Sequence, residues 1–136
     1  MGKTYNLFVS HSWSYGDAYD RLIGLLDAAP YFSFKDFSVP KDEPVHNAPN
    51  AAALYEAIKR QIAPCHVVLI MAGKYATYSN WINKEIRIAK TDFSKPIVAV
   101  KPWGAEQIST VVREAADVEA NWNTNSITEA IRSVVV

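Results

Sequence analysis

The stretch Cys65–Met71, with the sequence CHVVLIM, decides the fold class, because it is the most continuous apolar run in the chain. It lies between Pro64 and Gly73, two residues of the types that commonly interrupt regular structure. A short apolar run with such boundaries is typical of a strand that is buried on both faces. Such strands occur in parallel sheets with helices on both sides, so the run predicts the centre of an α/β fold.

Strand-like and helix-like patterns alternate on both sides of this run. Short runs rich in apolar, aromatic and β-branched residues predict further strands at 5–10, 31–37, 96–100 and 118–122. Apolar residues at helical spacing predict helices at 17–29, 51–63, 79–91 and 107–116, and a last helix from an N-cap at Ser126 to about Val134. This alternation predicts a flavodoxin-like, three-layer α/β fold with a five-stranded parallel sheet of order 2-1-3-4-5.

Length and composition are those of one globular domain. The 136 residues are 49% hydrophobic and 21% charged, so we expect a single domain over residues 1–136. Fourteen basic and fourteen acidic side chains balance to a net charge of zero. That balance argues against a basic face for nucleic acid, and we expect no nucleic-acid partner.

The compartment is predicted from cysteine usage and hydropathy. The single cysteine excludes an intrachain disulfide and fits a reducing compartment. No apolar run approaches the roughly 18 to 20 residues of a membrane span. The first residues form no signal-peptide core, so we expect a cytoplasmic protein that does not engage a membrane.

The chain lacks the motifs of several protein classes that share this architecture. A phosphorelay receiver needs a phosphate-accepting aspartate after the third strand, where this chain has Met71, Ala72 and Gly73. The chain contains no G-x-G-x-x-G, no Walker loop and no G-x-S-x-G serine elbow. Its three histidines lack the spacing of zinc ligands, and one cysteine cannot form a thiolate cluster, so we expect no metal site.

The predicted topology also places a ligand site. In a 2-1-3-4-5 sheet the strand order reverses between the first and third strands, and ligands bind there beyond the carboxyl ends of the strands. Three segments would surround that crevice: residues 10–14, the loop after Phe37, and residues 71–85. The loop from Ser38 to Asn50 contains three prolines and is long for a compact domain, which is typical of a functional or mobile segment.

Residues 79–86, with the sequence SNWINKEI, are the most informative part of these segments. On a helix Trp81 and Glu85 share one face, next to a stripe that should dock on the sheet. We therefore expect Glu85 at the margin of the buried face, where a half-buried carboxylate beside an indole suits a cation or an oxocarbenium-like centre. The same spacing also fits an exposed Glu85 that pairs with a nearby lysine.

Three segments together resemble the Toll/interleukin-1 receptor (TIR) superfamily. Leu7–Ser12 (LFVSHS) resembles the box on its first strand, and Phe34–Pro40 (FKDFSVP), followed by Pro44, resembles its second strand and the start of its BB loop. Trp81–Ile86 (WINKEI) resembles the W-x-x-x-E helix of TIR domains that cleave NAD. The segment around Pro40 and Pro44 is most similar to the bacterial TIR-like proteins of Thoeris-type antiphage systems.

The resemblance implies roles for individual residues. Glu85 falls on the catalytic glutamate of the family, and the loop from Phe37 to Asn47 falls on a region that covers the site or contacts a neighbouring subunit. This chain has Ser12 and Trp13 where some eukaryotic relatives carry arginines, so hydroxyls and backbone amides would bind phosphate instead. The residues implied to bind substrate are Phe8, Ser10, His11, Ser12, Trp13, Phe37 and Trp81.

The activity implied is that of an NAD glycohydrolase or ADP-ribosyl cyclase in antiviral defence. NAD is then a substrate, and no cofactor is expected. Nicotinamide leaves as a neutral molecule from a cationic precursor, so one carboxylate suffices without a general acid. The resemblance further implies homo-oligomers on activation and a separate effector protein that receives a cyclic ADP-ribose-type signal.

Two other functions remain open at this point. A non-enzymatic interaction module would dock a partner through the loop at 38–50. An enzyme similar to nucleoside deoxyribosyltransferases would use Glu85 as a nucleophile. Cys65 and His66 are expected to be structural, since both belong to the central apolar run.

Overall fold

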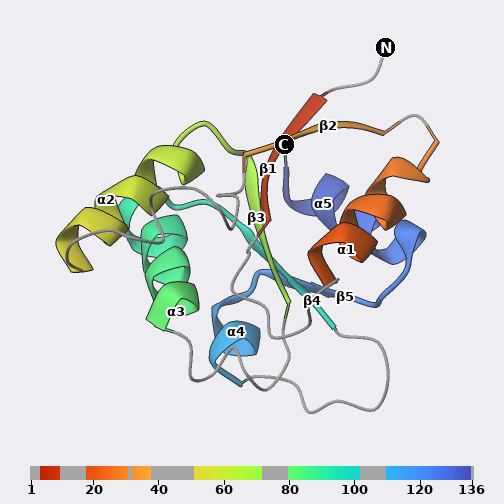
Figure 1. Ribbon diagram of the computed structural model, residues 1–136. Helices are drawn as coiled ribbons and strands as arrows, with labels where there is room; N and C mark the ends of the chain where they lie inside the picture. Colours follow the sequence, from red (N-terminus) through yellow and green to blue (C-terminus); the bar gives the residue numbers. More distant parts are fainter. Residues whose placement is uncertain are drawn as a thin grey trace.

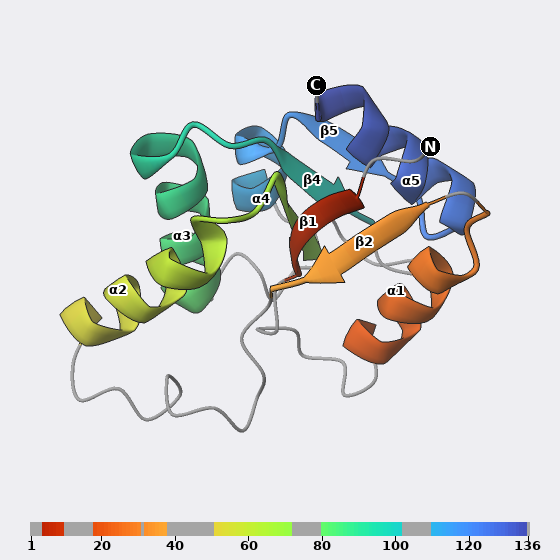
Figure 2. The same ribbon diagram turned by 90° about the horizontal axis from the view of Figure 1, so that it is seen from above.

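The computed structural model describes residues 4–9, 18–30, 32–37, 51–71, 80–101 and 110–135. Its strands form one sheet of order β2-β1-β3-β4-β5, and every neighbouring pair is parallel. The strands are β1 (Thr4–Val9), β2 (Ser33–Asp36), β3 (Val67–Met71), β4 (Ile97–Val100) and β5 (Val118–Ala120). Figure 2 shows β2 and β5 at the two edges of this sheet. The predicted flavodoxin-like fold and strand order are confirmed.

The helices cover the sheet on both sides (Figure 1). They are α1 (Ala18–Asp27), α2 (Ala51–Ile62), α3 (Asn80–Arg87), α4 (Thr110–Ala115) and α5 (Thr124–Val134), and a π-helix, η3 (Ile88–Asp92), continues α3. Helices α1 and α5 pack on one face of the sheet, and α2, α3 and α4 pack on the other.

Side chains along β1 point alternately to the two faces of the sheet, which explains how both faces contribute to the core. Leu7 and Val9 are completely buried on the side of α1 and α5, and Phe8, which is 1% exposed, is buried on the side of α2 and α3. In β3, Leu69 and Ile70 divide in the same way. Because both faces are buried, the central strands need apolar residues at every position, which is why they are continuous apolar runs in the sequence.

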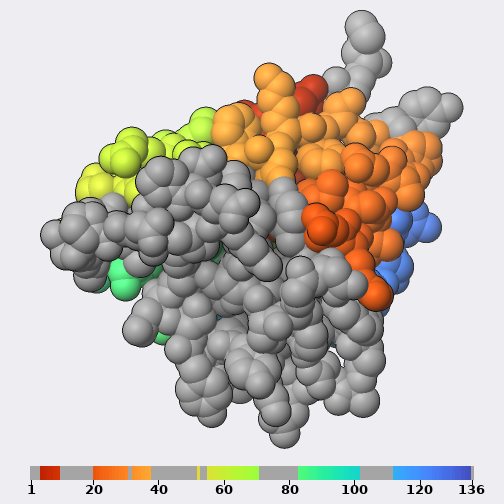
Figure 3. Space-filling model, viewed as in Figure 1, coloured from red at the N-terminus to blue at the C-terminus, as the bar shows by residue number. Residues whose placement is uncertain are grey.

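The sheet edge at β2 is open, in contrast to its centre. Ser33, Lys35 and Asp36 are exposed, and only Phe34 is half-buried. Atoms of this segment (orange) lie on the surface along the upper edge in Figure 3. A short edge strand with charged side chains is a common protection against unwanted strand pairing.

One local prediction, the cap of the last helix, was wrong, and a second, the helix at 79–91, was right in extent but not in helix type. The last helix is capped by Asn123, whose side chain accepts a hydrogen bond from the backbone N–H of Ser126 at 2.7 Å. Ser126 lies inside the helix, and its hydroxyl accepts from the backbone N–H of Asn121. The helix predicted at 79–91 is α-helical only to Arg87 and then widens into η3, which ends before Ser94 at a positive φ of 53°.

Some expectations fall outside the described residues, among them the loop at 38–50. The described helices include none that is both long and apolar enough to cross a membrane.

Candidate functional site

The reversal of strand order lies between β1 and β3, as predicted. Val9 pairs with Leu69 in the parallel register of these strands, and the backbone N–H of Phe37 donates to the carbonyl of Leu7 at 2.8 Å just after β2. The carboxyl ends of β2, β1 and β3 therefore lie side by side. The next described element after β3 is α3, which begins at Asn80. The topology thus brings α3 to the edge of the sheet where ligands bind in such folds.

Glu85 is the central residue of this site. Its side chain is 0% exposed, and the residues three and four positions later, Ile88 and Ala89, are 0% exposed as well. The three residues form the face of α3 and η3 that packs toward the sheet. The prediction of a half-buried carboxylate was therefore wrong, because Glu85 is completely buried, and the alternative of an exposed glutamate is excluded for the same reason.

A buried carboxylate is unusual in this molecule. Among the described residues, the buried polar or charged side chains are Glu85 and Thr128. Thr128 donates its hydroxyl to carbonyls of its own helix, at 3.0 Å to Thr124 and 3.3 Å to Asn125. A hydroxyl satisfied in this way is cheap to bury, whereas a carboxylate is costly to remove from water. Glu85 is thus the residue whose burial most requires an explanation beyond packing.

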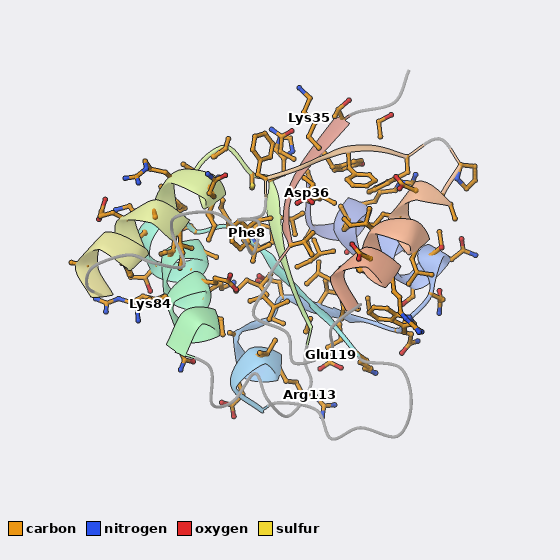
Figure 4. All side chains as sticks on the ribbon, in the orientation of Figure 1. Phe8, Lys35, Asp36, Lys84, Arg113 and Glu119 are labelled. Carbon is orange, nitrogen blue, oxygen red and sulfur yellow. The ribbon has the colours of Figure 1, made fainter. Side chains whose placement is uncertain are left out.

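The other predicted site residues are placed as follows. Phe8 belongs to the core cluster between the sheet and helices α2 and α3, and Figure 4 shows it there. Phe37 is half-buried and packs against the same cluster. Trp81 lies in α3 one turn before Glu85, and its side chain is outside the description. Outside the described residues altogether are Ser10, His11, Ser12 and Trp13.

Polar contacts join the segment between η3 and β4 to the end of α2. Lys95 donates from Nζ to three carbonyls near the end of α2, at 3.1 Å to Ile62, 2.5 Å to Ala63 and 2.5 Å to Cys65. Burial lowers the pKa of Lys95 from its usual value. The carbonyl of Ile62 belongs to the last turn of α2, where carbonyls lack partners within the helix, and those of Ala63 and Cys65 lie in the segment that follows.

Asp117 links η3 to β4 through two hydrogen bonds; we call this link and the hydrogen bonds of Lys95 the Asp117 and Lys95 clamps. Its Oδ2 atom accepts from Lys90 Nζ at 2.7 Å and from the backbone N–H of Ile97 at 2.9 Å. Burial by itself raises the pKa of Asp117, but the hydrogen bonds from Lys90 and Ile97 outweigh it, so the pKa lies below its usual value. The clamp fixes where the π-helix lies relative to the sheet.

Cys65 and His66 have structural roles, as predicted. Burial raises the pKa of the Cys65 thiol to about 12, so it is not a reactive thiolate at neutral pH. His66 accepts a hydrogen bond at Nδ1 from the backbone N–H of Asn6 at 2.9 Å, which joins β1 to the residues before β3. Within the described ranges, no group of His, Cys, Asp and Glu side chains could hold a metal ion.

A groove between α2 and α3 was not predicted from the sequence. We call it the α2–α3 groove; it has a volume of about 650 Å³. Its charged and aromatic lining consists of Tyr55, Glu56, Lys59, Lys84, Arg87 and Asp92. The only sequence feature that corresponds to the groove is a set of polar side chains at helical spacing on two helices. Any solvated helix face shows the same pattern, so the sequence does not predict the groove.

Comparison with known proteins supplies the family. The family model of the Thoeris protein ThsB, TIR-like domain, matches residues 8–107, which contain the end of β1, strands β2 to β4 and helices α1 to α3. No curated protein matches the chain. The matched region includes Glu85, Trp81, Phe8 and Phe37, and the parallel sheet agrees with the fold expected from the TIR resemblance. The chain therefore belongs to the family of Thoeris ThsB TIR-like domains.

Proposed function

We propose that this TIR-type defence protein cleaves the bond between nicotinamide and ribose in NAD, with Glu85 as the catalytic residue. The observation that supports the proposal is that the protein retains a carboxylate, costly to bury, on α3, the helix that begins at the edge of the sheet where ligands bind. Membership of the ThsB TIR-like family supports the same activity.

The chemistry needs little more than one carboxylate. As the bond to nicotinamide breaks, positive charge develops at the anomeric carbon of ribose, and the Glu85 carboxylate stabilises it. Nicotinamide departs as a neutral molecule, so no residue has to protonate it. Because Glu85 is enclosed by protein, its charge acts in a medium of lower dielectric than water and is worth more there.

The fate of the ribosyl centre depends on which nucleophile reaches it. Water gives ADP-ribose, whereas a nitrogen or hydroxyl of the same molecule gives a cyclic product when water is excluded. A cyclic product would be the signal to a separate effector protein. NAD is the substrate in this scheme, and no other cofactor takes part.

The remaining parts of the site are assigned from the family resemblance. Trp81 and Phe37 would contact the rings of NAD, and residues 10–13 would bind its phosphates through hydroxyls and backbone amides. Phe8 would support the site from within the core, since its side chain is only 1% exposed.

The direct test is to incubate the purified protein with NAD and to measure free nicotinamide. Release of nicotinamide by the wild-type protein, and not by an identically purified Glu85→Gln protein, supports the proposal. A deoxynucleoside offered in place of NAD tests the deoxyribosyltransferase alternative. If NAD stays intact at all protein concentrations and in the presence of the other defence components, the interaction-module alternative is favoured.

We expect activity to depend on self-association. A ligand site usually encloses most of its ligand, and one small subunit leaves much of a dinucleotide in water. Specific activity should therefore rise with protein concentration across a wide dilution series, with the oligomeric state followed by light scattering. Constant specific activity from a protein that stays monomeric would contradict this expectation.

A further inference from the structure

The α2–α3 groove lies on the opposite face of α3 from Glu85. A helix turns by about 100° per residue, so Asn83 and Arg87, which line the groove, lie close to half a turn away from Glu85. Exposure agrees with this geometry, because Asn83 and Arg87 are exposed and Glu85 is buried. The groove is therefore separate from the candidate catalytic site, although one helix contributes to both.

Three cationic side chains converge on the groove from two helices. Lys59 comes from α2, and Lys84 and Arg87 come from α3. Figure 4 shows Lys84 on the side of α3 that faces away from the sheet. Lysine and arginine side chains held close together by two packed helices repel one another and favour an anion between them.

The acidic side chains of the groove neutralise only part of this charge. Asp92 accepts a hydrogen bond from the hydroxyl of Tyr55 and lies 3.9 Å from Lys59 Nζ. The hydrogen bond to Asp92 raises the pKa of Tyr55, so its hydroxyl stays protonated and keeps donating. Glu56 is exposed to water. Lys84 and Arg87 on α3 remain as the cations best placed for a phosphate or similar anion.

The groove also offers a surface for a planar ring. The guanidinium of Arg87 lies over the ring of Tyr55, 5.7 Å from its centroid, in cation–π geometry. An arginine that lies on an aromatic ring can bind phosphate with its edge, and the outer face of its planar guanidinium can stack on a base. A volume of about 650 Å³ exceeds what an inorganic anion fills and lies in the range of small-molecule sites.

From these observations we propose that the α2–α3 groove is a second ligand site, which binds a small phosphorylated molecule with a planar ring, of the nucleotide class. Lys84 and Arg87 bind its phosphate groups, and its ring packs against the Arg87–Tyr55 pair. The proposal does not depend on NAD cleavage, since it concerns binding to the outer face of α3.

The test is calorimetric titration of the full chain with ADP, pyrophosphate and adenosine. ADP should bind more tightly than either fragment, because only ADP offers both the phosphates and the ring. The double variant Lys84→Gln/Arg87→Gln should weaken the binding of ADP by about tenfold or more, since two charge-assisted hydrogen-bonding groups are lost. The matched control is Lys101→Gln/Arg113→Gln, which removes two exposed cations beside Glu119, away from the groove, and should leave the affinity unchanged.

The outcomes separate this site from the catalytic one. Equal binding of ADP by the groove variant and the wild-type protein would place ADP elsewhere and overturn the proposal. Absence of ADP binding at about 1 mM would overturn it as well. Thermal unfolding of both double variants checks that they are folded. Because the measurement is binding and not turnover, a failure of NAD cleavage leaves the result interpretable.

Discussion

The two faces of the sheet are packed with similar apolar clusters but differ in their polar contents. On the side of α1 and α5, the buried polar residue is Thr128, whose hydroxyl bonds to its own helix. On the side of α2, α3 and α4, the helix layer carries the buried Glu85, a π-helix and the Lys95 and Asp117 clamps. Among the described residues, the first face buries a polar group that its own helix satisfies, and the second also buries a carboxylate.

The difference teaches where function is concentrated in this molecule. A buried carboxylate lowers stability unless its surroundings stabilise it, so a protein retains one where the charge is needed. π-Helical turns are also frequent at functional sites, and here one follows the α-helix that carries Glu85. The two features are close together, because Glu85 lies three residues before Ile88, the first residue of η3. The predictions that follow test whether the two faces differ in function as they differ in content.

The largest effect is expected from truncating the core on either face. Phe8→Ala should lower the free energy of unfolding by about 3–5 kcal/mol, and Leu7→Ala, its neighbour on the opposite face, by about 2–5 kcal/mol. Both residues are buried completely or nearly so. Urea unfolding measures the loss. The milder pair Phe8→Leu and Leu7→Val then separates the faces, because NAD cleavage should fall only for Phe8→Leu. Equal activity of Phe8→Leu and Leu7→Val would show that the two faces of the sheet do not differ in function.

The second effect concerns the two buried polar residues. Glu85→Gln keeps the shape of the side chain and removes its charge, so nicotinamide release should fall by about 10² to 10³-fold, as when one preorganised electrostatic contact is lost. Thr128→Val, the matched change on the other face, should leave activity within about twofold, since the hydroxyl only bonds to its own helix. Full activity of a folded Glu85→Gln protein would refute the central proposal.

A smaller effect is expected from the Lys95 clamp. Lys95→Met keeps the aliphatic stem and removes the three hydrogen bonds to the end of α2, which should cost about 1.5–3 kcal/mol of stability. Lys101→Met is the control, because Lys101 forms a partly exposed ion pair with Glu119 at 3.6 Å and should contribute about 1 kcal/mol or less. If both variants lose equally little, Lys95 does not anchor α2 as its contacts indicate.

The smallest effect should depend on pH. The folded pKa of Asp117 lies below its ordinary value of 3.8, so its carboxylate stabilises the folded protein above that pH. The stabilisation is lost as the pH falls through the folded pKa. Asp117→Asn should therefore cost about 1 kcal/mol at pH 7, and the difference from wild type should narrow in acid below pH 3.8. A difference that stays constant over this range would exclude Asp117 as the titrating group.

Much of the fold could be predicted because it depends on local patterns. The apolar run at 65–71 and the alternation of strands and helices around it led to the correct sheet order. The boundaries were less accurate, as the cap at Asn123 in place of Ser126 shows. Both residue types are good caps, and which one begins a helix depends on how the chain leaves the preceding strand.

The sequence by itself determined that Glu85 lies on a helix after the third strand, and that strands and helices alternate along the chain. Periodicity decides such matters, because it depends only on neighbours in the chain. Only the tertiary structure decided that Glu85 is completely buried, that Asp117 bonds to Lys90 and Ile97, and that α2 and α3 enclose a groove. These features arise between residues far apart in the chain, whose packing fixes burial and polar partners in ways that no local pattern contains.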